Sequence, residues 1–186
     1  MRSTIRTLFS ALALIGLLAA CSSEGSSLPP LQSAKTDDTN YRLGPGDKLH
    51  IQVLGAEDLT GDYAVGDNGT INSPLIGDVK AVGLTRAQLE REMEKKLAEG
   101  YIKNPHVSVS ILTYRPFYIY GEVTKPGEYP YASGMRVMSA VATAGGYTYR
   151  ANENYVVVTR DGVQRKAPPN APIQPDDVIK VPERYF

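Results

Sequence analysis

Few side chains in this chain of 186 residues have the types and spacing that catalysis requires. The single cysteine, Cys21, has no partner for an internal disulfide, and no group of cysteines and histidines has the spacing of a zinc site. His50 and His106 fall at exposed positions of predicted strands, whereas a catalytic histidine needs a nucleophile and an orienting carboxylate within reach. We therefore predict no catalytic residue, no metal site and no cofactor.

The carboxylates are more numerous, and a pair of them could hydrolyse a glycosidic bond if their environments differed. Most lie in predicted turns, where an aspartate ordinarily accepts hydrogen bonds from the nearby backbone. No two of them stand out as an acid and a base, so the sequence predicts a protein that is not an enzyme and leaves a glycan hydrolase as an alternative. The acidic candidates are Glu57, Asp58, Asp62, Asp67, Glu122, Glu128, Asp176 and Asp177.

The N-terminal residues indicate another role for the thiol. Two basic residues, Arg2 and Arg6, precede an apolar run over residues 8–20, which is shorter than the ~20 residues of a membrane-spanning helix. This order of basic, apolar and small residues is typical of a secretory signal peptide, so we predict one over residues 1–20. An ordinary signal peptide followed by a chance cysteine is the alternative to a lipid-attachment site.

The end of this run, Leu18-Ala19-Ala20-Cys21, resembles the lipobox of bacterial lipoproteins. The resemblance implies cleavage between Ala20 and Cys21 and acylation of Cys21, which would attach the protein to membrane lipid. Because Ser22 and not aspartate follows Cys21, it also implies sorting to the outer membrane, with the protein facing the periplasm. Residues 21–40 are rich in Ser, Pro, Asp and Thr, so we expect a lipidated flexible tether there.

The charge balance gives no sign of a nucleic-acid partner. The chain has 20 Lys and Arg against 20 Asp and Glu, and loss of Arg2 and Arg6 with the signal peptide would leave 18 basic side chains against 20 acidic ones. A protein that binds nucleic acid needs a basic surplus to neutralise phosphates. We therefore expect no contact with nucleic acid.

Residues 41–113 predict a small α+β unit. Alternating apolar residues predict half-buried strands over residues 48–54 and 106–112. Asn68-Gly69 predicts a hairpin between strands that end at residue 65 and begin at residue 70. Thr85 and Gln88 form a capping-box pattern at the start of a helix expected over residues 85–100.

Residues 114–186 predict a second α+β unit, with strands over residues 117–123, 128–131, 155–159, 163–166 and 178–181. Asp161-Gly162 predicts a hairpin turn. Ser133 is the expected N-cap of a helix that ends at Gly145-Gly146 and buries Val137, Met138, Val141 and Ala144. One pattern occurs in both units: Pro45-Gly46-Asp47 and Pro175-Asp176-Asp177 each precede alternating apolar residues, which indicates a turn that leads into a strand.

Tyrosines are concentrated at the start of the second unit. In strand phase, Tyr114, Tyr118 and Tyr120 share one face, and Phe117 and Ile119 share the other. An aromatic face with polar tips could contact a glycan or another subunit. Packing within the fold explains the same pattern, because tyrosine is a good strand former, and composition leaves these readings open.

The order of the motifs resembles the outer-membrane polysaccharide export family. Tyr41-Arg42-Leu43-Gly44-Pro45-Gly46-Asp47-Lys48-Leu49-His50-Ile51 is similar to its opening, and the later motifs follow in its order: Asp67-Asn68-Gly69-Thr70-Ile71, Pro74-Leu75-Ile76-Gly77, Gly83-Leu84-Thr85 and Tyr101-Ile102-Lys103-Asn104-Pro105. Gly121-Glu122-Val123, Pro126-Gly127 and Ala144-Gly145-Gly146 resemble the β-grasp SLBB module that follows in that family. The resemblance implies an export domain over residues 41–113 and one SLBB module over residues 114–186. It gives structural roles to Gly44, Pro45, Gly46, Asp47, Gly69, Gly121, Pro126, Gly127, Gly145 and Gly146.

The resemblance also implies a function. Members of the family are lipoproteins that form periplasmic rings, which would make this chain a cyclic homo-oligomer that passes capsule or exopolysaccharide to the cell surface. They act with an inner-membrane polysaccharide co-polymerase, often one with a tyrosine kinase. Long members add a C-terminal helix that builds the outer-membrane pore, and we expect no such helix after residue 181 of this sequence. We therefore expect a separate outer-membrane β-barrel to receive the polymer, with residues 183–186 in the contact. A glycan-binding accessory lipoprotein without a channel is the alternative.

Overall fold

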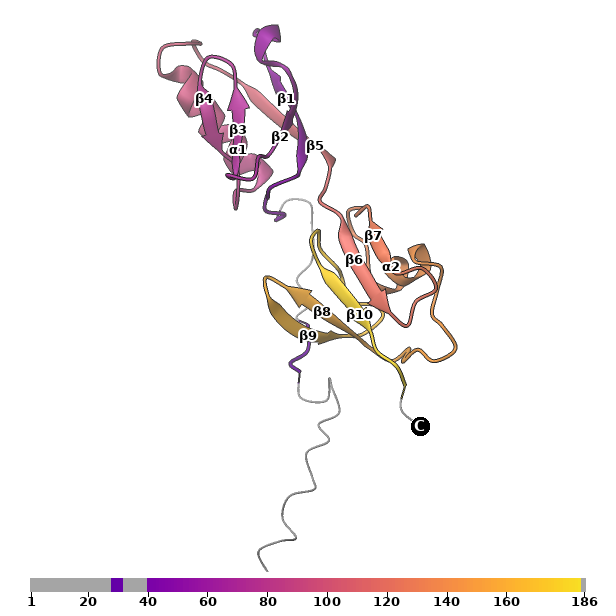
Figure 1. The fold of residues 1–186 in the computed structure, drawn as a ribbon. Helices are drawn as coiled ribbons and strands as arrows, with labels where there is room; N and C mark the ends of the chain where they lie inside the picture. The colour runs from indigo at the N-terminus through magenta and orange to yellow at the C-terminus, as the bar shows by residue number, and fades with distance from the viewer. Residues whose placement is uncertain (1–27, 32–39, 185–186) are drawn as a thin grey trace, which may run out of the picture.

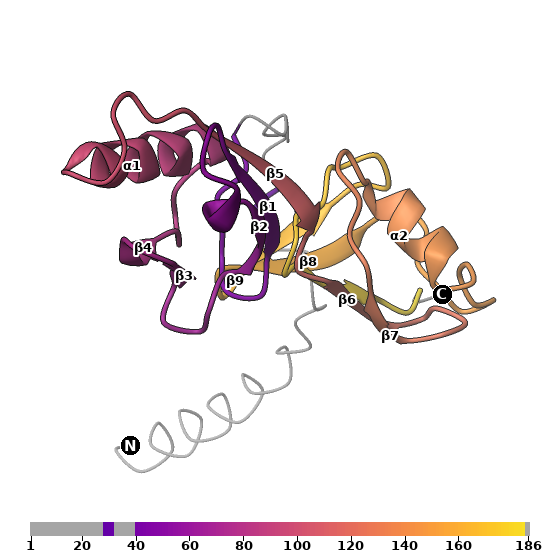
Figure 2. The same ribbon diagram turned by 90° about the horizontal axis from the view of Figure 1, so that it is seen from above.

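The computed structural model describes residues 28–31 and 40–184, which form two α+β units placed end to end (Figure 1). The α+β fold class predicted from the sequence is confirmed. The first unit contains β1 to β5 and α1, and the second contains β6 to β10 and α2. The chain passes from one unit to the other between β5 and β6 (Figure 2).

The first unit is built on a three-stranded antiparallel sheet of order β2-β1-β5. Leu49, Ile51 and Val53 of β1 are buried, as their alternation predicts. The helix α1 packs against β5, and its Leu89 and Met93 are fully buried in the same core. The elements are β1 (Lys48–Val53), the 3-10 turn η1 (Glu57–Leu59), β2 (Gly61–Ala64), β3 (Thr70–Ser73), β4 (Gly77–Lys80), α1 (Arg86–Ala98) and β5 (Val107–Thr113).

The predicted capping box of α1 is confirmed. The N–H of Thr85 donates to Oε1 of Gln88 at 2.8 Å, and the N–H of Gln88 donates to Oγ1 of Thr85 at 3.3 Å. The helix also closes the outer edge of β5, because side-chain carboxylates of Glu94 and Glu90 accept the N–H groups of Val107 and Val109 at 3.0 and 2.9 Å. Those two strand donors are therefore satisfied without another strand.

The prediction of a hairpin around Asn68-Gly69 is wrong. The turn itself forms, but β2 before it pairs with β1, whereas β3 after it pairs with β4. The turn therefore links two sheets. Gly69 has φ +77°, and a Cβ there would lie 2.4 Å from Cγ1 of Val82. The hairpin of this region is β3–β4.

The second unit contains a five-stranded sheet of order β7-β6-β10-β8-β9. β10 lies parallel to β6 and antiparallel to β8. The predicted Asp161-Gly162 turn joins β8 to β9, and both residues have positive φ, at 50° and 75°. The elements are β6 (Phe117–Gly121), β7 (Gly127–Tyr129), α2 (Val137–Thr143), β8 (Val156–Arg160), β9 (Val163–Ala167) and β10 (Val178–Val181).

The helix α2 differs from its prediction at its start and on its buried face. Its N-cap is Arg136 rather than Ser133, and no side chain caps it. Met138 is 61% exposed, whereas Val137 and Ala140 are fully buried. A helix buries positions three and four apart, and Met138 lies off the stripe that Val137 begins.

The expected tether needs a correction at residues 28–31, the only part of residues 21–39 that the structure describes. The N–H of Leu31 donates to the carbonyl of Lys166 at 2.7 Å, and the N–H of Lys166 donates to the carbonyl of Pro29 at 2.9 Å. These bonds add a short segment to the β9 edge, where Pro30 pairs in parallel with Lys166. Leu31 is 6% exposed and belongs to the core of the second unit. A single leucine has no period, so the pattern gave no sign of this contact.

Candidate functional site

The carboxylate of Asp47 is fully buried at the boundary between the two units. Oη of Tyr41 lies 2.9 and 2.7 Å from its two oxygens. The N–H of Gly44 donates to it at 2.8 Å, and the N–H of Arg115, in the linker before β6, donates at 3.1 Å. Burial, together with the bond to Asp47, raises the pKa of Tyr41, which therefore stays a neutral donor at physiological pH.

The guanidinium of Arg115 lies between the units. Its Nε lies 3.6 Å from Oδ1 of Asp47, and its Nη1 lies 3.5 Å from Oδ2 of Asp176 in the second unit. Its Nη2 lies 3.4 Å from Oη of Tyr41. Burial lowers the pKa of Arg115, and the bond to Tyr41 and the charges of Asp47 and Asp176 outweigh it, so the pKa rises. A Cβ on Gly44 would lie 2.5 Å from Cζ of Arg115, so only glycine leaves room for this guanidinium.

Tyrosine rings fill the apolar side of the same boundary. The ring of Tyr114 meets Tyr41 edge-on at a centroid distance of 5.1 Å and Tyr131 edge-on at 5.4 Å. Tyr114 thus packs against the cores of both units. The expectation that it shares an open face with Tyr118 and Tyr120 is wrong, because β6 begins only at Phe117.

The second Pro-x-Asp turn lies on the other side of Arg115. Its Asp177 is also fully buried and accepts from Nε and Nη2 of Arg160 at 2.8 and 2.7 Å and from the N–H of Gln174 at 2.7 Å. The N–H of Asp176 donates to the carbonyl of Pro116 at 2.8 Å, which ties this turn to the linker. Both Pro-x-Asp segments are therefore turns that lead into strands, β1 and β10, as the repeated pattern predicts.

A cleft of about 560 Å³ opens between the units at this boundary. Hydrogen-bonding side chains from both units and from the linker line it, and it holds no serine or cysteine nucleophile. Within residues 28–31 and 40–184, no group of acidic residues, histidine and cysteine has the arrangement of a metal site. The lining residues of the cleft are Asn40, Tyr41, Arg42, Thr85, Arg115, Arg160, Asp161, Gln174, Pro175 and Asp176.

Comparison with known proteins assigns both units. Residues 35–112 match the polysaccharide biosynthesis/export protein family, and residues 116–169 match the SLBB domain. The chain belongs to the polysaccharide export family. The first unit is its export domain and the second is one SLBB module.

Curated relatives carry related names. The exopolysaccharide production protein ExoF of Rhizobium meliloti (strain 1021) is 39% identical over 71% of this chain and 32% of its own length. The polysialic acid transport protein KpsD of Escherichia coli is 30% identical over 66% of this chain and 22% of its own length. The EPS I polysaccharide export outer membrane protein EpsA of Ralstonia nicotianae is 27% identical over 88% of this chain and 52% of its own length. The chain therefore spans about a fifth to about half of these relatives.

Several motif glycines lie where a side chain would collide. Gly121, at the end of β6, has φ +89°, and a Cβ there would lie 2.2 Å from the carbonyl oxygen of Val181 on β10. A Cβ on Gly145 would lie 3.1 Å from Cβ of Thr124, in the loop after β6. Gly146 has φ +88° in the turn after α2, and Pro126-Gly127 leads into β7. Ala20 and Cys21 lie outside the described residues.

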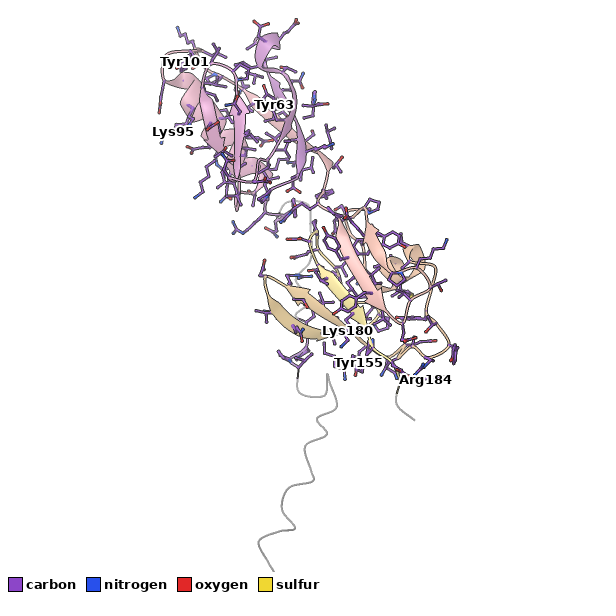
Figure 3. The ribbon with its side chains drawn as sticks, in the orientation of Figure 1. Tyr63, Lys95, Tyr101, Tyr155, Lys180 and Arg184 are labelled. Carbon is purple, nitrogen blue, oxygen red and sulfur yellow. The ribbon has the colours of Figure 1, made fainter. Side chains whose placement is uncertain are left out.

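Tyr118 and Tyr120 lie on the outer face of the SLBB sheet, at 38% and 45% exposure, opposite the buried Phe117 and Ile119. Their neighbours on β10 are Val178 and Lys180, in parallel register. Figure 3 labels Lys180 and Tyr155 in the SLBB module, and Lys166 lies over the ring of Tyr155 at 3.8 Å from its centroid. The face therefore combines aromatic rings with a cation. Its contact with a glycan or with another subunit stays a prediction.

Sequence reasoning missed several residues at the domain boundary. Arg115 received no role, although it stands beside a proline at a predicted domain boundary. Arg160 and Gln174 also received none, because their roles depend on the fold bringing β8 beside the second Pro-x-Asp turn. The repeated Pro-x-Asp pattern was the available signal, since a buried aspartate requires a donor.

Proposed function

We propose that this protein is a component of a capsule or exopolysaccharide export conduit, held at the outer membrane through Cys21 and facing the periplasm. The observation that carries the proposal is the direct union of an export domain with an SLBB module through one buried polar junction at Asp47 and Arg115. The names of ExoF, KpsD and EpsA, each tied to polysaccharide production, transport or export, support it.

The proposed mechanism is geometric. Copies of the chain assemble head to tail into a closed ring, and the ring surrounds a hydrated passage for the polymer. Ring closure requires a defined angle between the export domain and the SLBB module, and the contacts between Asp47 and Arg115 support such an angle. An inner-membrane polysaccharide co-polymerase, alone or with a tyrosine kinase, delivers the polymer, and a separate outer-membrane β-barrel receives it.

None of the helices that the structure describes is both long enough and apolar enough to span a bilayer.

Deletion of the gene tests the proposal most directly. Polysaccharide should disappear from the cell surface and accumulate in the periplasm, and the wild-type gene should restore export. The Cys21→Ser variant should fail to incorporate labelled palmitate and should leave the outer-membrane fraction. Normal surface polysaccharide in the deletion strain would refute the export role.

Mass photometry of the detergent-extracted protein separates the ring from the accessory alternative. A ring predicts a species well above a dimer, whereas an accessory glycan-binding lipoprotein predicts a monomer at every concentration. The Tyr118→Ala/Tyr120→Ala variant then tests whether the outer face of the SLBB sheet contacts another subunit or the polymer. Loss of the large species indicates a subunit contact, and reduced export by an intact ring indicates a contact with the polymer.

A further inference from the structure

We propose that the cleft between the export domain and the SLBB module is a saccharide-binding site that takes one hydroxyl-rich unit of the exported polymer. This inference rests on the proposed export function. The volume of about 560 Å³ lies within the ~300–1,000 Å³ of small-molecule sites, which occur preferentially at domain interfaces. The lining comes from four places in the chain: the start of the export domain, the N-cap of α1, the linker, and the turns of the SLBB module.

Three guanidinium groups supply donors to the cleft. Each guanidinium carries five N–H groups, and Arg42 spends one nitrogen, Nη1, on the carbonyl of Gly83 at 2.6 Å. Arg160 directs Nε and Nη2 to Asp177. Arg115 is the least satisfied, because its Nη2 and Nη1 groups make only long contacts, at 3.4 and 3.5 Å, whereas its Nε is buried. Donor capacity therefore remains at the cleft.

Acceptors line the cleft together with these donors. Asp161 and Asp176 present carboxylates from two turns of the SLBB module, and Asn40 and Gln174 present amides that both donate and accept. A sugar hydroxyl also donates and accepts at once, so a lining of this kind can bind neighbouring hydroxyls in pairs.

The charge count decides against a strongly anionic ligand. The three arginines at the cleft face Asp161 and Asp176 at its surface, and the buried Asp47 and Asp177 lie behind Arg115 and Arg160. Three positive groups therefore stand against four negative ones. Phosphate would meet no surplus of positive charge, whereas a ligand bound through hydroxyls needs none.

A bound sugar would contact both domains at once. It would thereby favour the domain angle at which Asn40 and Arg42 on one side and Gln174 and Asp161 on the other reach it together. The cleft would then couple the presence of polymer to the geometry of the conduit.

The test is a titration of the purified full chain with short oligosaccharides, released by partial hydrolysis from the exopolysaccharide of the producing strain. Isothermal titration calorimetry should show binding that inorganic phosphate does not displace. Gln174→Ala and Asp161→Asn should each weaken it about fivefold, the effect of one hydrogen bond worth about 1 kcal/mol. Both variants leave the buried bonds of Asp47 and Asp177 in place, since Gln174 reaches Asp177 through its backbone.

The control is Asp58→Asn in η1, an exposed residue of the export domain outside the cleft lining. It should bind as the wild type does. Absence of binding, displacement by phosphate, or a loss caused by Tyr118→Ala/Tyr120→Ala but not by the cleft variants would overturn the inference. These binding results do not depend on the deletion strain. Failure of the export role itself would appear there as unchanged surface polysaccharide.

Discussion

Two turns of one sequence pattern, residues 44–47 and 174–177, end in buried aspartates that lead into β1 and β10. In each turn the aspartate accepts the N–H of the residue three before it, Gly44 at 2.8 Å or Gln174 at 2.7 Å. The third residue has positive φ in both, 92° at Gly46 and 70° at Asp176. The local geometry is shared, so the difference between the turns lies in what else each carboxylate binds.

Asp177 binds an arginine of its own domain. The fork of Arg160 reaches it at 2.8 and 2.7 Å, a close bidentate pair of the stronger kind. Asp47 binds Arg115 of the linker, whose N–H donates at 3.1 Å and whose Nε lies 3.6 Å away. The turn that ends at Asp177 therefore stabilises the SLBB module alone. The turn that ends at Asp47 joins the export domain to the linker.

The largest effect is expected from breaking the closer pair. Asp177→Ala would leave Arg160, only 15% exposed, without its counter-charge, and removing one partner of a buried pair costs about 3–5 kcal/mol. The free energy of unfolding, measured in urea by circular dichroism, should fall by that amount. Asp58→Ala, at an exposed site, should change it by less than about 0.5 kcal/mol. A loss no greater than the control would show that the pair contributes little.

Gly44→Ala should show how the two turns differ, because it disturbs only the turn that contacts Arg115. The new Cβ would lie 2.5 Å from Cζ of Arg115, so the guanidinium must leave its place over the turn, while the free energy of unfolding should change little because the end of a flexible side chain can move. Residue 174 is a glutamine in the second turn, which shows that the turn itself accepts a side chain there. Limited proteolysis should cut the 114–116 linker faster.

Gly61→Ala is the matched control, because an added Cβ at Gly61 meets nothing within 4 Å. Its linker should be cut at the wild-type rate. Equal protection of the Gly44→Ala linker would mean that Arg115 does not hold the domains together.

Alkaline pH should weaken the Asp47 junction. Burial and the bond to Asp47 raise the pKa of Tyr41 in the folded protein, so the stability it gives is complete below the ordinary tyrosine pKa of ~10 and is lost as pH rises beyond it. Unfolding of the wild type should become easier above that pH. Tyr41→Phe should show a shallower decline, from a lower starting stability because its hydroxyl bonds are gone.

Tyr147 must be considered in the same titration, because burial and then the charge of Glu153 also raise its pKa. Tyr147→Phe should remove a separate part of the decline. If the stability of Tyr41→Phe declines with rising pH as steeply as that of the wild type, the alkaline loss of stability comes from other groups.

Local signals predicted those parts of the fold whose partners are near in sequence. The capping box of Thr85 and Gln88 and the Asp161-Gly162 turn involve residues within a few positions of each other, and both formed. The Asn68-Gly69 turn also formed, but the pairing of its flanks depends on competition with β1 and β4, which no local pattern reports. Parallel pairing of β6 with β10 joins residues about 60 positions apart and was beyond reach for the same reason.

The candidate site divides in the same way. Gly44, Pro45 and Asp47 were recognised as a motif because they are adjacent in the chain. Arg115 lies 68 positions from Asp47, and its role requires the linker to return to the turn. Leu31 reached the SLBB core from a segment whose composition predicts no structure, because one apolar side chain and two backbone bonds suffice at an open strand edge.

The smallest effect is expected at the outer contact of Arg115. Asp176 is 64% exposed and lies 3.5 Å from Nη1 of Arg115, and exposed pairs of this kind contribute about 0.2–1 kcal/mol. Asp176→Asn keeps the turn, since asparagine also tolerates positive φ, and it should barely change the free energy of unfolding. It should make the proteolysis rate of the linker less dependent on salt, because the screened charge pair is gone. Asp161→Asn is the control, as Asp161 is another exposed aspartate with positive φ in a neighbouring turn, and its linker should keep the wild-type salt response. An unchanged salt response in Asp176→Asn would show that the Asp176 carboxylate does not contribute to the junction, which would then rest on Asp47, Tyr41 and the backbone bond from Asp176 to Pro116.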